Sequence, residues 1–225
     1  MKKFNFVFVI MFTAVCYADD IIAGKTVMIS DEVEIKKTEG VTVISYTGNS
    51  KAVNNCNEIT ADKMTYYKEK SDLLAEGKVK LSLKNKKGEP IEASGNFAKY
   101  NTASQAGEIY GDNALIKYLI EGSTVPYTLY AKKIDIDRKN QILRAYDDVK
   151  VTTSYGTIRS DNGVFDQDNT SIVFKKDKKK PIADVHHDGE EGRYEADEMI
   201  FYNKGNRIIM KGSITGKINM KKDIK

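Results

Sequence analysis

The sequence has little of three residue types that often fix a fold. Its 225 residues include no tryptophan, three prolines and two cysteines. Cys16 lies in an apolar N-terminal segment that we expect to be removed, so Cys56 alone would remain. A single cysteine excludes an internal disulfide, and the fold must rely on burial and strand pairing. Pro90, Pro126 and Pro181 each fall at the boundary of an expected strand, where no ladder hydrogen bond is lost.

Motifs of common enzymes are also missing. The sequence contains no G-x-S-x-G, no glycine-rich phosphate loop, no H-E-x-x-H and no C-x-x-C. The only histidines, His186 and His187, are adjacent. Neighbours on a strand point to opposite faces, so both could hold one metal ion only from a loop. We therefore expect no catalytic residue, no metal site and no cofactor, and the protein is not expected to be an enzyme.

Long hydrophobic runs are limited to one segment near the start. Residues 4–15 are almost wholly apolar, but the run is shorter than the roughly 20 residues that span a bilayer. Lys2 and Lys3 precede it and the small residue Ala18 follows it, which is the pattern of a cleaved signal peptide. We expect cleavage near Ala18, which removes residues 1–18 and leaves residues 19–225 as one exported domain. An uncleaved membrane anchor is the alternative.

A large excess of one charge is absent as well. Lys and Arg number 36 against 32 Asp and Glu, and removal of Lys2 and Lys3 lowers the formal net charge from +4 to +2. This balance argues against a surface for polyanions, and we expect no nucleic-acid partner. One dense charge run, residues 175–181, is expected to be a solvated loop that blocks edge pairing, with phosphate binding as the alternative.

What the sequence does contain is a repeat. In each of five units a small residue and a polar pair lead into an apolar strand, and a turn brings a second strand back. Apolar and polar residues alternate along these strands with period two, as in a sheet with one buried face. The fold class is therefore all-β, a single domain of stacked antiparallel β-hairpins. The units are 29 to 38 residues apart and begin at Ile59, Ile91, Leu129, Ile158 and Tyr194.

The apolar face of these strands decides the function. A sandwich would bury it in a closed core, whereas an open stack would leave an apolar groove. The lack of tryptophan and the constant width of the repeats favour a groove, and exposed terminal strands favour pairing with other chains at the edges. The side chains expected to line this groove are Met64, Tyr66, Leu74, Val79, Leu81, Phe97, Ile109, Ile116, Ile134, Ile136, Ile142, Val149, Val151, Phe165, Met199, Phe201, Ile208 and Met210.

Several short motifs in the repeats resemble those of the OstA-like family. A Tyr-Thr-Gly-Asn turn, an I-x-A-D strand start and an A-x-G-x-V return strand follow one another in the family's order. The strand start and the return recur near the C-terminus, and the resemblance extends over roughly residues 21–218. The motifs are Tyr46–Asn49, Ile59–Tyr66, Ala75–Val79, Tyr194–Met199 and Met210–Ile214.

The resemblance implies a twisted, V-shaped β-jellyroll with an apolar groove. It implies a periplasmic protein that carries or bridges lipopolysaccharide from the inner to the outer membrane, with the lipid A acyl chains held by the groove-lining residues. Its implied partners are further copies stacked head to tail, and inner- and outer-membrane components of lipopolysaccharide transport that pair with its edge strands. Within the family, the soluble bridge component fits best.

Three alternatives stay open. The chain could be the periplasmic domain of a partner anchored in the inner membrane, or a structural β-stack of the envelope with a closed core. It could also be an enzyme acting on envelope glycan, which would need Asp135 and Asp137 to act together. Alternation places both carboxylates on the wet face, opposite Ile134 and Ile136, which is the ordinary arrangement of a solvated strand.

Overall fold

The computed structural model describes residues 9–11, 25–54, 57–84, 90–118, 126–166, 169, 171–187, 190–202 and 207–219. Cys16, Cys56 and the expected cleavage site after Ala18 lie outside these residues. Within the described part, no helix has the length and apolar character needed to cross a membrane.

The described residues form one sheet of seventeen strands, in which most neighbours are antiparallel hairpins. A single 3-10 turn, η1 (Lys68–Lys70), connects two of them. The prediction of an all-β stack of hairpins is confirmed. The strands are β1 (Val9–Met11), β2 (Lys25–Ile29), β3 (Glu32–Thr38), β4 (Val41–Asn54), β5 (Asn57–Tyr67), β6 (Asp72–Lys84), β7 (Pro90–Asn101), β8 (Ala106–Tyr118), β9 (Tyr127–Asp137), β10 (Ile142–Thr153), β11 (Gly156–Asp166), β12 (Ser171–Lys175), β13 (Ile182–His187), β14 (Glu190–Glu195), β15 (Glu198–Tyr202), β16 (Arg207–Lys211) and β17 (Thr215–Asn219).

A line of β-bulges crosses the long strands near their middle, and we call this line the crease. A bulge adds an unpaired residue to one strand and bends it. Gly48 and Gly77 sit at the crease with φ of 74° and 75°, a left-handed conformation that glycine adopts without strain. The register shifts fall between Thr47 and Ser50, Thr60 and Lys63, Glu76 and Val79, Ser94 and Phe97, Tyr110 and Ala114, and Tyr146 and Val149.

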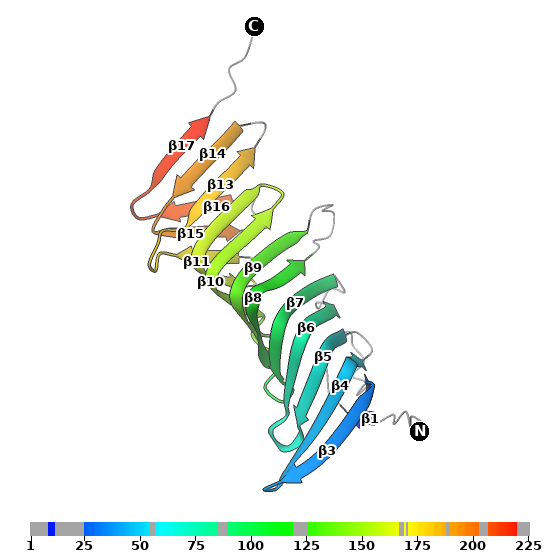
Figure 1. Ribbon diagram of the computed structural model, residues 1–225. Coiled ribbons are helices and arrows are strands. Elements are labelled where there is room, and N and C mark those ends of the chain that lie inside the picture. The colour runs from blue at the N-terminus through cyan, green and yellow to red at the C-terminus, as the bar shows by residue number, and fades with distance from the viewer. Residues whose placement is uncertain are drawn as a thin grey trace.

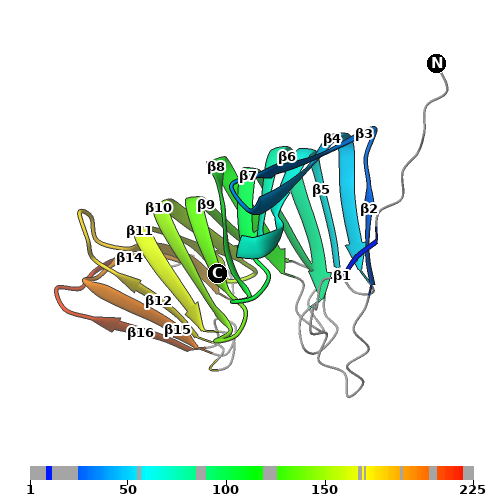
Figure 2. The ribbon, with the colours of Figure 1, turned by 90° about the horizontal axis from the view of Figure 1, so that it is seen from below.

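The crease divides the sheet into two arms. The first arm contains β3, β12, β15 and β16, the second contains β2, β13, β14 and β17, and β4 to β11 run through both. The division is clearest where β11 pairs with β12 on one arm and with β13 on the other. Figure 1 shows the strands stacked in chain order from β3 to β11, with β13, β14 and β17 continuing the stack, and Figure 2 shows β12, β15 and β16 lying apart from β14.

One apolar core lies between the arms and runs along the stack. Its members come from the first arm (Met64, Ile134), from the second arm (Ile116, Leu129) and from the crease itself (Ala114). Many of the buried residues near the crease are alanine, whose small side chains let the two arms approach each other closely. The inner face of each arm is therefore the apolar face that the alternation predicted.

The repeat units correspond to positions in this sheet. Four of the five unit starts lie in one row of register neighbours on the inner face of the second arm: Ile59, Leu129, Ile158 and Tyr194. The fifth, Ile91, lies two residues farther from the crease along β7. Each unit thus starts on the second arm, passes the crease at its polar pair and turns back on the first arm. The repeat is the geometric period of the stack.

Part of the expected signal peptide lies among the described residues. Within residues 1–18, Val9–Met11 forms strand β1, paired antiparallel with β2. Val9 and Ile10 are β-branched, and an edge strand such as β2 offers ladder groups to any extended segment. If residues 1–18 are removed as expected, β2 is left as the terminal strand of the second arm.

The crease glycines give a testable effect on stability. At Gly77 an added Cβ would lie 2.9 Å from the Asp62 Cβ, and the backbone φ is already positive, so we expect Gly77→Ala to lower the free energy of unfolding by about 2–4 kcal/mol. Gly40→Ala is the matched control, because Gly40 has φ of +81° but no atom within 4 Å of an added Cβ. Its loss should be only about 1–2 kcal/mol. Urea unfolding measures both, and equal losses would contradict a special role for the crease.

Candidate functional site

The space between the arms is filled by side chains next to the crease. On the first arm, four large side chains from one register row are each at most 1% exposed. They form two directly paired sets, Tyr46 with Met64 and Ile109 with Ile134. Burial raises the pKa of Tyr46 to about 12, and the neighbouring Tyr66 makes a smaller contribution in the same direction. Tyr46 Oη has no hydrogen-bond partner among the described residues. This inner part is a packed core.

Farther from the crease the same face becomes partly accessible on the later strands, whereas Tyr66 and Leu73, in the same register row on β5 and β6, are still buried. Ile136, Leu143, Phe165, Ile172 and Ile208 form a row across the first arm, and all are only partly buried against the core. We call this row the mouth row. Phe201 lies between Ile172 and Ile208 in this row but is only 5% exposed and belongs to the core, so the row is a partly accessible apolar border on the inner face of β9 to β12 and of β16.

A small apolar cavity connects the two regions. Its volume is ≈ 30 Å³, and residues of both arms line it, including Ile59 and Leu81 from the second and Leu73, Ile109 and Ile136 from the first. This volume is about that of one water molecule. An acyl chain does not fit this cavity unless the arms separate there.

An aromatic cluster closes the core toward the C-terminal end. Phe174 is fully buried, and its ring meets Phe165 and Phe201 edge-on at centroid distances of 6.3 Å and 5.7 Å. Edge-to-face rings are a favourable arrangement. Sequence reasoning missed Phe174, although its alternation with Ile172 on β12 is the signal that could have found it.

The eighteen side chains expected to line a groove fall into three groups. Ten are buried in the core: Met64, Tyr66, Val79, Ile109, Ile116, Ile134, Val149, Val151, Met199 and Phe201. Five are partly buried against that core: Leu81, Ile136, Phe165, Ile208 and Met210. The remaining three alternate with core residues and lie on the outer face: Leu74, Phe97 and Ile142.

The three misplacements have physical causes. Strict alternation from the buried Ala93 on β7 would place Phe97 on the inner face. The register shift at the crease adds one residue, so Ala98 points inward instead. Phe97 is 41% exposed and stacks on Tyr110. Leu74 and Ile142 each stand beside another apolar residue, and the neighbours Leu73 and Leu143 take the inner face.

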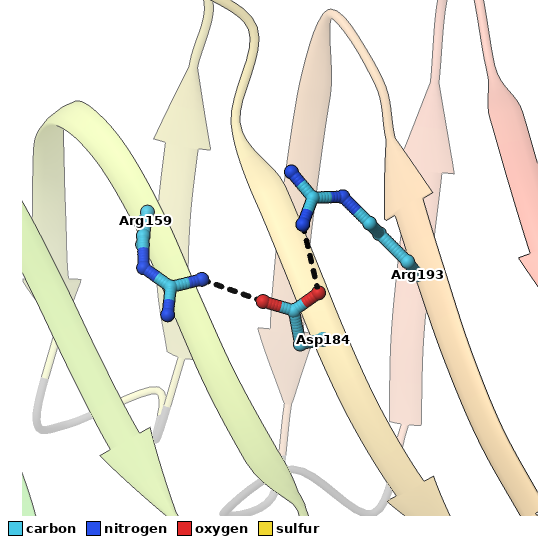
Figure 3. Close-up of polar contacts among 3 residues, drawn as sticks. All are labelled: Arg159, Asp184 and Arg193. Carbon is cyan, nitrogen blue, oxygen red and sulfur yellow. Dashed lines mark hydrogen bonds and ion pairs between the residues drawn. The ribbon is translucent and has the colours of Figure 1, made fainter.

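Polar interactions on the outer face hold the arms in shape. Asp184 of β13 contacts Arg159 of β11 at 2.5 Å and Arg193 of β14 at 3.6 Å, so one carboxylate joins three strands of the second arm (Figure 3). All three side chains are at least partly exposed, so each pair contributes little on its own. The arrangement is structural, since it binds strand to strand across the sheet.

The crease carries its own ion pairs. Lys132 Nζ lies 2.8 Å from Asp148, and this contact raises the pKa of Lys132 and lowers that of Asp148. The Lys-rich segment lies between β12 and β13 at the crease, where the Lys179 N–H donates to Asp161 Oδ2 at 2.8 Å. Lys180 Nζ donates to the Ser213 carbonyl at 2.9 Å. In the segment expected to be a solvated loop, Lys175 ends β12, residues 175–179 are exposed, and Lys180 is only partly exposed where it contacts Ser213.

Asp197 gives a pH dependence. The Ser213 N–H donates to Asp197 Oδ2 at 2.8 Å and, with Lys180 nearby, holds the pKa of Asp197 below its ordinary value of 3.8. A lowered folded-state pKa stabilises the fold above the unfolded value, and this stability is lost as pH falls below about 4. Asp197→Asn should therefore flatten the acid side of a plot of unfolding free energy against pH. Identical slopes in both proteins between pH 6 and about pH 3 would contradict this.

The described residues offer little to catalysis. They contain no cluster of three or more His, Cys, Asp or Glu placed to hold a metal ion. His186 faces Glu191 at 3.7 Å across a hairpin. Asp135 and Asp137 lie on the outer face, where Lys133 Nζ contacts Asp135 at 3.2 Å and the Asn140 side chain donates to Asp137 at 2.8 Å. Both carboxylates are engaged in ordinary surface interactions.

Comparison with known proteins finds a family whose model matches more than half of the chain. The profile of the family described as LptA/(LptD N-terminal domain) LPS transport protein matches residues 27–142, more than half of the 225 residues. A solved structure similar to the chain is the crystal structure of LptH, the LptA homologous periplasmic component of the conserved lipopolysaccharide transport device from Pseudomonas aeruginosa. That similarity covers 63% of this chain and 75% of the other, with 15% identity and a TM-score of 0.31. No curated protein matches the chain.

Proposed function

The chain belongs to the LptA/(LptD N-terminal domain) LPS transport protein family, and from this we propose that it carries lipopolysaccharide through the periplasm. The acyl chains bind at the opening between the arms, and the protein performs no chemistry on them. The mature protein begins after a signal peptide that ends near Ala18. Energy for directed movement comes from a partner.

The mouth row is the observation that supports this proposal most strongly. Ile136, Leu143 and Ile208 are apolar, partly accessible and aligned along the stack. Removing each methylene of an acyl chain from water is favourable by about 0.8 kcal/mol, so such a row binds lipid tails without any polar group. Because similar side chains recur on successive strands, a tail meets similar sites along the stack and moves without a large barrier.

The terminal strands support a bridging role. At the C-terminal end the two arms end with β16 and β17. At the N-terminal end the first arm ends with β3, and the second arm would end with β2 once β1 is removed with the signal peptide. Exposed edges recruit a further strand by main-chain hydrogen bonds. The pairing of β1 with β2 is an example of such recruitment within this chain. We propose that copies stack head to tail and that membrane-bound transport partners pair with the outermost edges.

The test is photo-crosslinking in cells. A photoreactive amino acid at Leu143, on the mouth row, should give an adduct that an antibody to lipopolysaccharide detects. The same amino acid at Lys150, an exposed outer-face position on the same strand, should give at least tenfold less adduct. Comparable yields at both positions would contradict binding between the arms.

A second candidate is a closed structural β-stack, which the filled core beside the crease favours. It predicts no lipid adduct at Leu143. A partner with an uncleaved anchor is distinguished by a separate measurement, because mass spectrometry of the mature protein reports whether residues 1–18 are present.

A further inference from the structure

The outer face of the first arm carries a row of exposed aromatic rings. Phe97, Tyr110 and Tyr146 are 41%, 39% and 36% exposed. Phe97 and Tyr110 are register neighbours whose rings stack at a centroid distance of 5.3 Å and an interplanar angle of 16°. Lys133 lies between Tyr110 and Tyr146 in the register. Exposed apolar rings gathered in this way mark a binding surface more often than scattered ones do.

A polar hollow borders this aromatic row. Its volume is ≈ 570 Å³, which is within the usual range for ligand sites. A second register row, two residues from the first, supplies its charged groups: Lys99, Glu108, Asp135 and Arg144. The hollow extends to the tips of the hairpins, where its remaining polar walls are Asp72, Asn101, Ser104 and Asp137.

The walls of the hollow are held in place before any ligand binds. Lys133 Nζ contacts Glu108 at 2.6 Å and Asp135 at 3.2 Å. At the tips, the Asn101 side chain donates to Asp72 at 2.8 Å, and the Asn140 backbone N–H donates to Asp137 at 3.0 Å. Groups ordered in this way lose little freedom on binding.

The charge of the hollow selects the class of ligand. Its three cations, Lys99, Lys133 and Arg144, face four carboxylates, those of Asp72, Glu108, Asp135 and Asp137. This balance gives no attraction for phosphate or another polyanion. A neutral ligand that presents C–H faces to aromatic rings and hydroxyl groups to carboxylates and amines fits both rows. Sugars have this chemistry.

The position of the hollow indicates where the sugar comes from. Lys99, Gly107, Glu108 and Ile136 line both the hollow and the apolar cavity between the arms, so the two lie back to back across the sheet. The glycan of a lipid held at the mouth row would leave the opening at the hairpin tips, which form one end of the hollow. We propose that the hollow and the aromatic row bind neutral sugars in the saccharide part of the transported lipopolysaccharide. This inference rests on the proposed transport function.

The test separates sugar from lipid. Lipid-free, dephosphorylated core oligosaccharide is titrated calorimetrically into the full-length chain and into Tyr110→Ala/Tyr146→Ala, with Tyr146→Ala alone as a milder variant. The double variant should lose at least tenfold in affinity and the single variant at least threefold. Tyr155→Ala removes a tyrosine of similar exposure (37%) on a turn of the second arm and should change affinity less than twofold. Circular dichroism checks that every variant is folded.

Two results would overturn the inference: no heat of binding at millimolar oligosaccharide, or equal affinity in all four proteins. Tighter binding of the phosphorylated oligosaccharide than of the dephosphorylated one would refute the charge argument. The Leu143 adduct tests the transport proposal independently of sugar binding. If the adduct forms but no sugar binds, only the proposed role of the hollow is wrong. If sugar binds but no adduct forms, the proposed lipid site between the arms is wrong.

Discussion

Phe174→Ala should lower the free energy of unfolding by about 3–5 kcal/mol. The Phe174 ring is fully buried and meets two other rings edge-on, so its removal leaves a cavity that the rigid inner faces of β11, β12 and β15 cannot refill. For a domain whose total stability is typically about 5–15 kcal/mol, such a loss removes between about a fifth and all of it. Urea unfolding followed by circular dichroism measures the change.

Phe97→Ala is the matched control for this prediction. Phe97 also stacks on a ring, but it is 41% exposed on the outer face and its removal leaves no buried cavity. We expect a loss of about 0.5–1.5 kcal/mol, the usual value of one aromatic pair. If the two variants lose equal stability, the assignment of inner and outer faces on the first arm is wrong.

Ile136→Asp should abolish lipid transport while the protein remains folded. Ile136 lies on the mouth row and is only partly buried, so its replacement leaves the inner core intact. A carboxylate there faces the proposed path of the acyl chains and would have to be desolvated beside them, at a cost of several kcal/mol. We expect at least a tenfold loss of lipopolysaccharide adduct at Leu143, measured by crosslinking in cells.

Leu115→Asp separates this effect from a general loss of stability. Leu115 on β8 is also partly buried, but it alternates with Ala114 and Ile116 of the core and lies on the outer face. Its variant should retain the adduct at Leu143. Loss of the adduct in both variants would indicate a general loss of stability, and retention of the adduct in both would contradict the placement of Ile136 on the lipid path.

The sequence predicts the architecture well because its signals are local. The alternation along each strand, the turns between strands and the recurring hairpin unit all follow from hairpin geometry. As a result, four of the unit starts lie in a single row of the sheet: Ile59, Leu129, Ile158 and Tyr194. The motif A-x-G-x-V around Gly77 also has a structural meaning, because that glycine forms the bulge of β6 at the crease.

The inner face was harder to predict because the crease changes its phase. On β5, β7 and β9 the inward residues pass from Ala61 to Met64, from Gly95 to Ala98 and from Ala131 to Ile134, so a strict period of two fails at these points. The position of each bulge depends on how neighbouring strands pair, so the sequence of one strand alone does not predict it. The polar hollow on the outer face is likewise assembled from distant segments, and only its individual charges are visible in the sequence.

The crease also determines where this protein tolerates changes in length. A residue inserted at a hairpin tip lengthens a loop and leaves both faces of both arms unchanged. A residue inserted within β7 directly after Ala98 would move every later side chain of that strand to the opposite face. Tyr100 would then point to the outer face and Lys99 to the inner face. Natural variation in loop length should therefore concentrate at the two rows of tips, and the distance from tip to crease should stay constant from strand to strand.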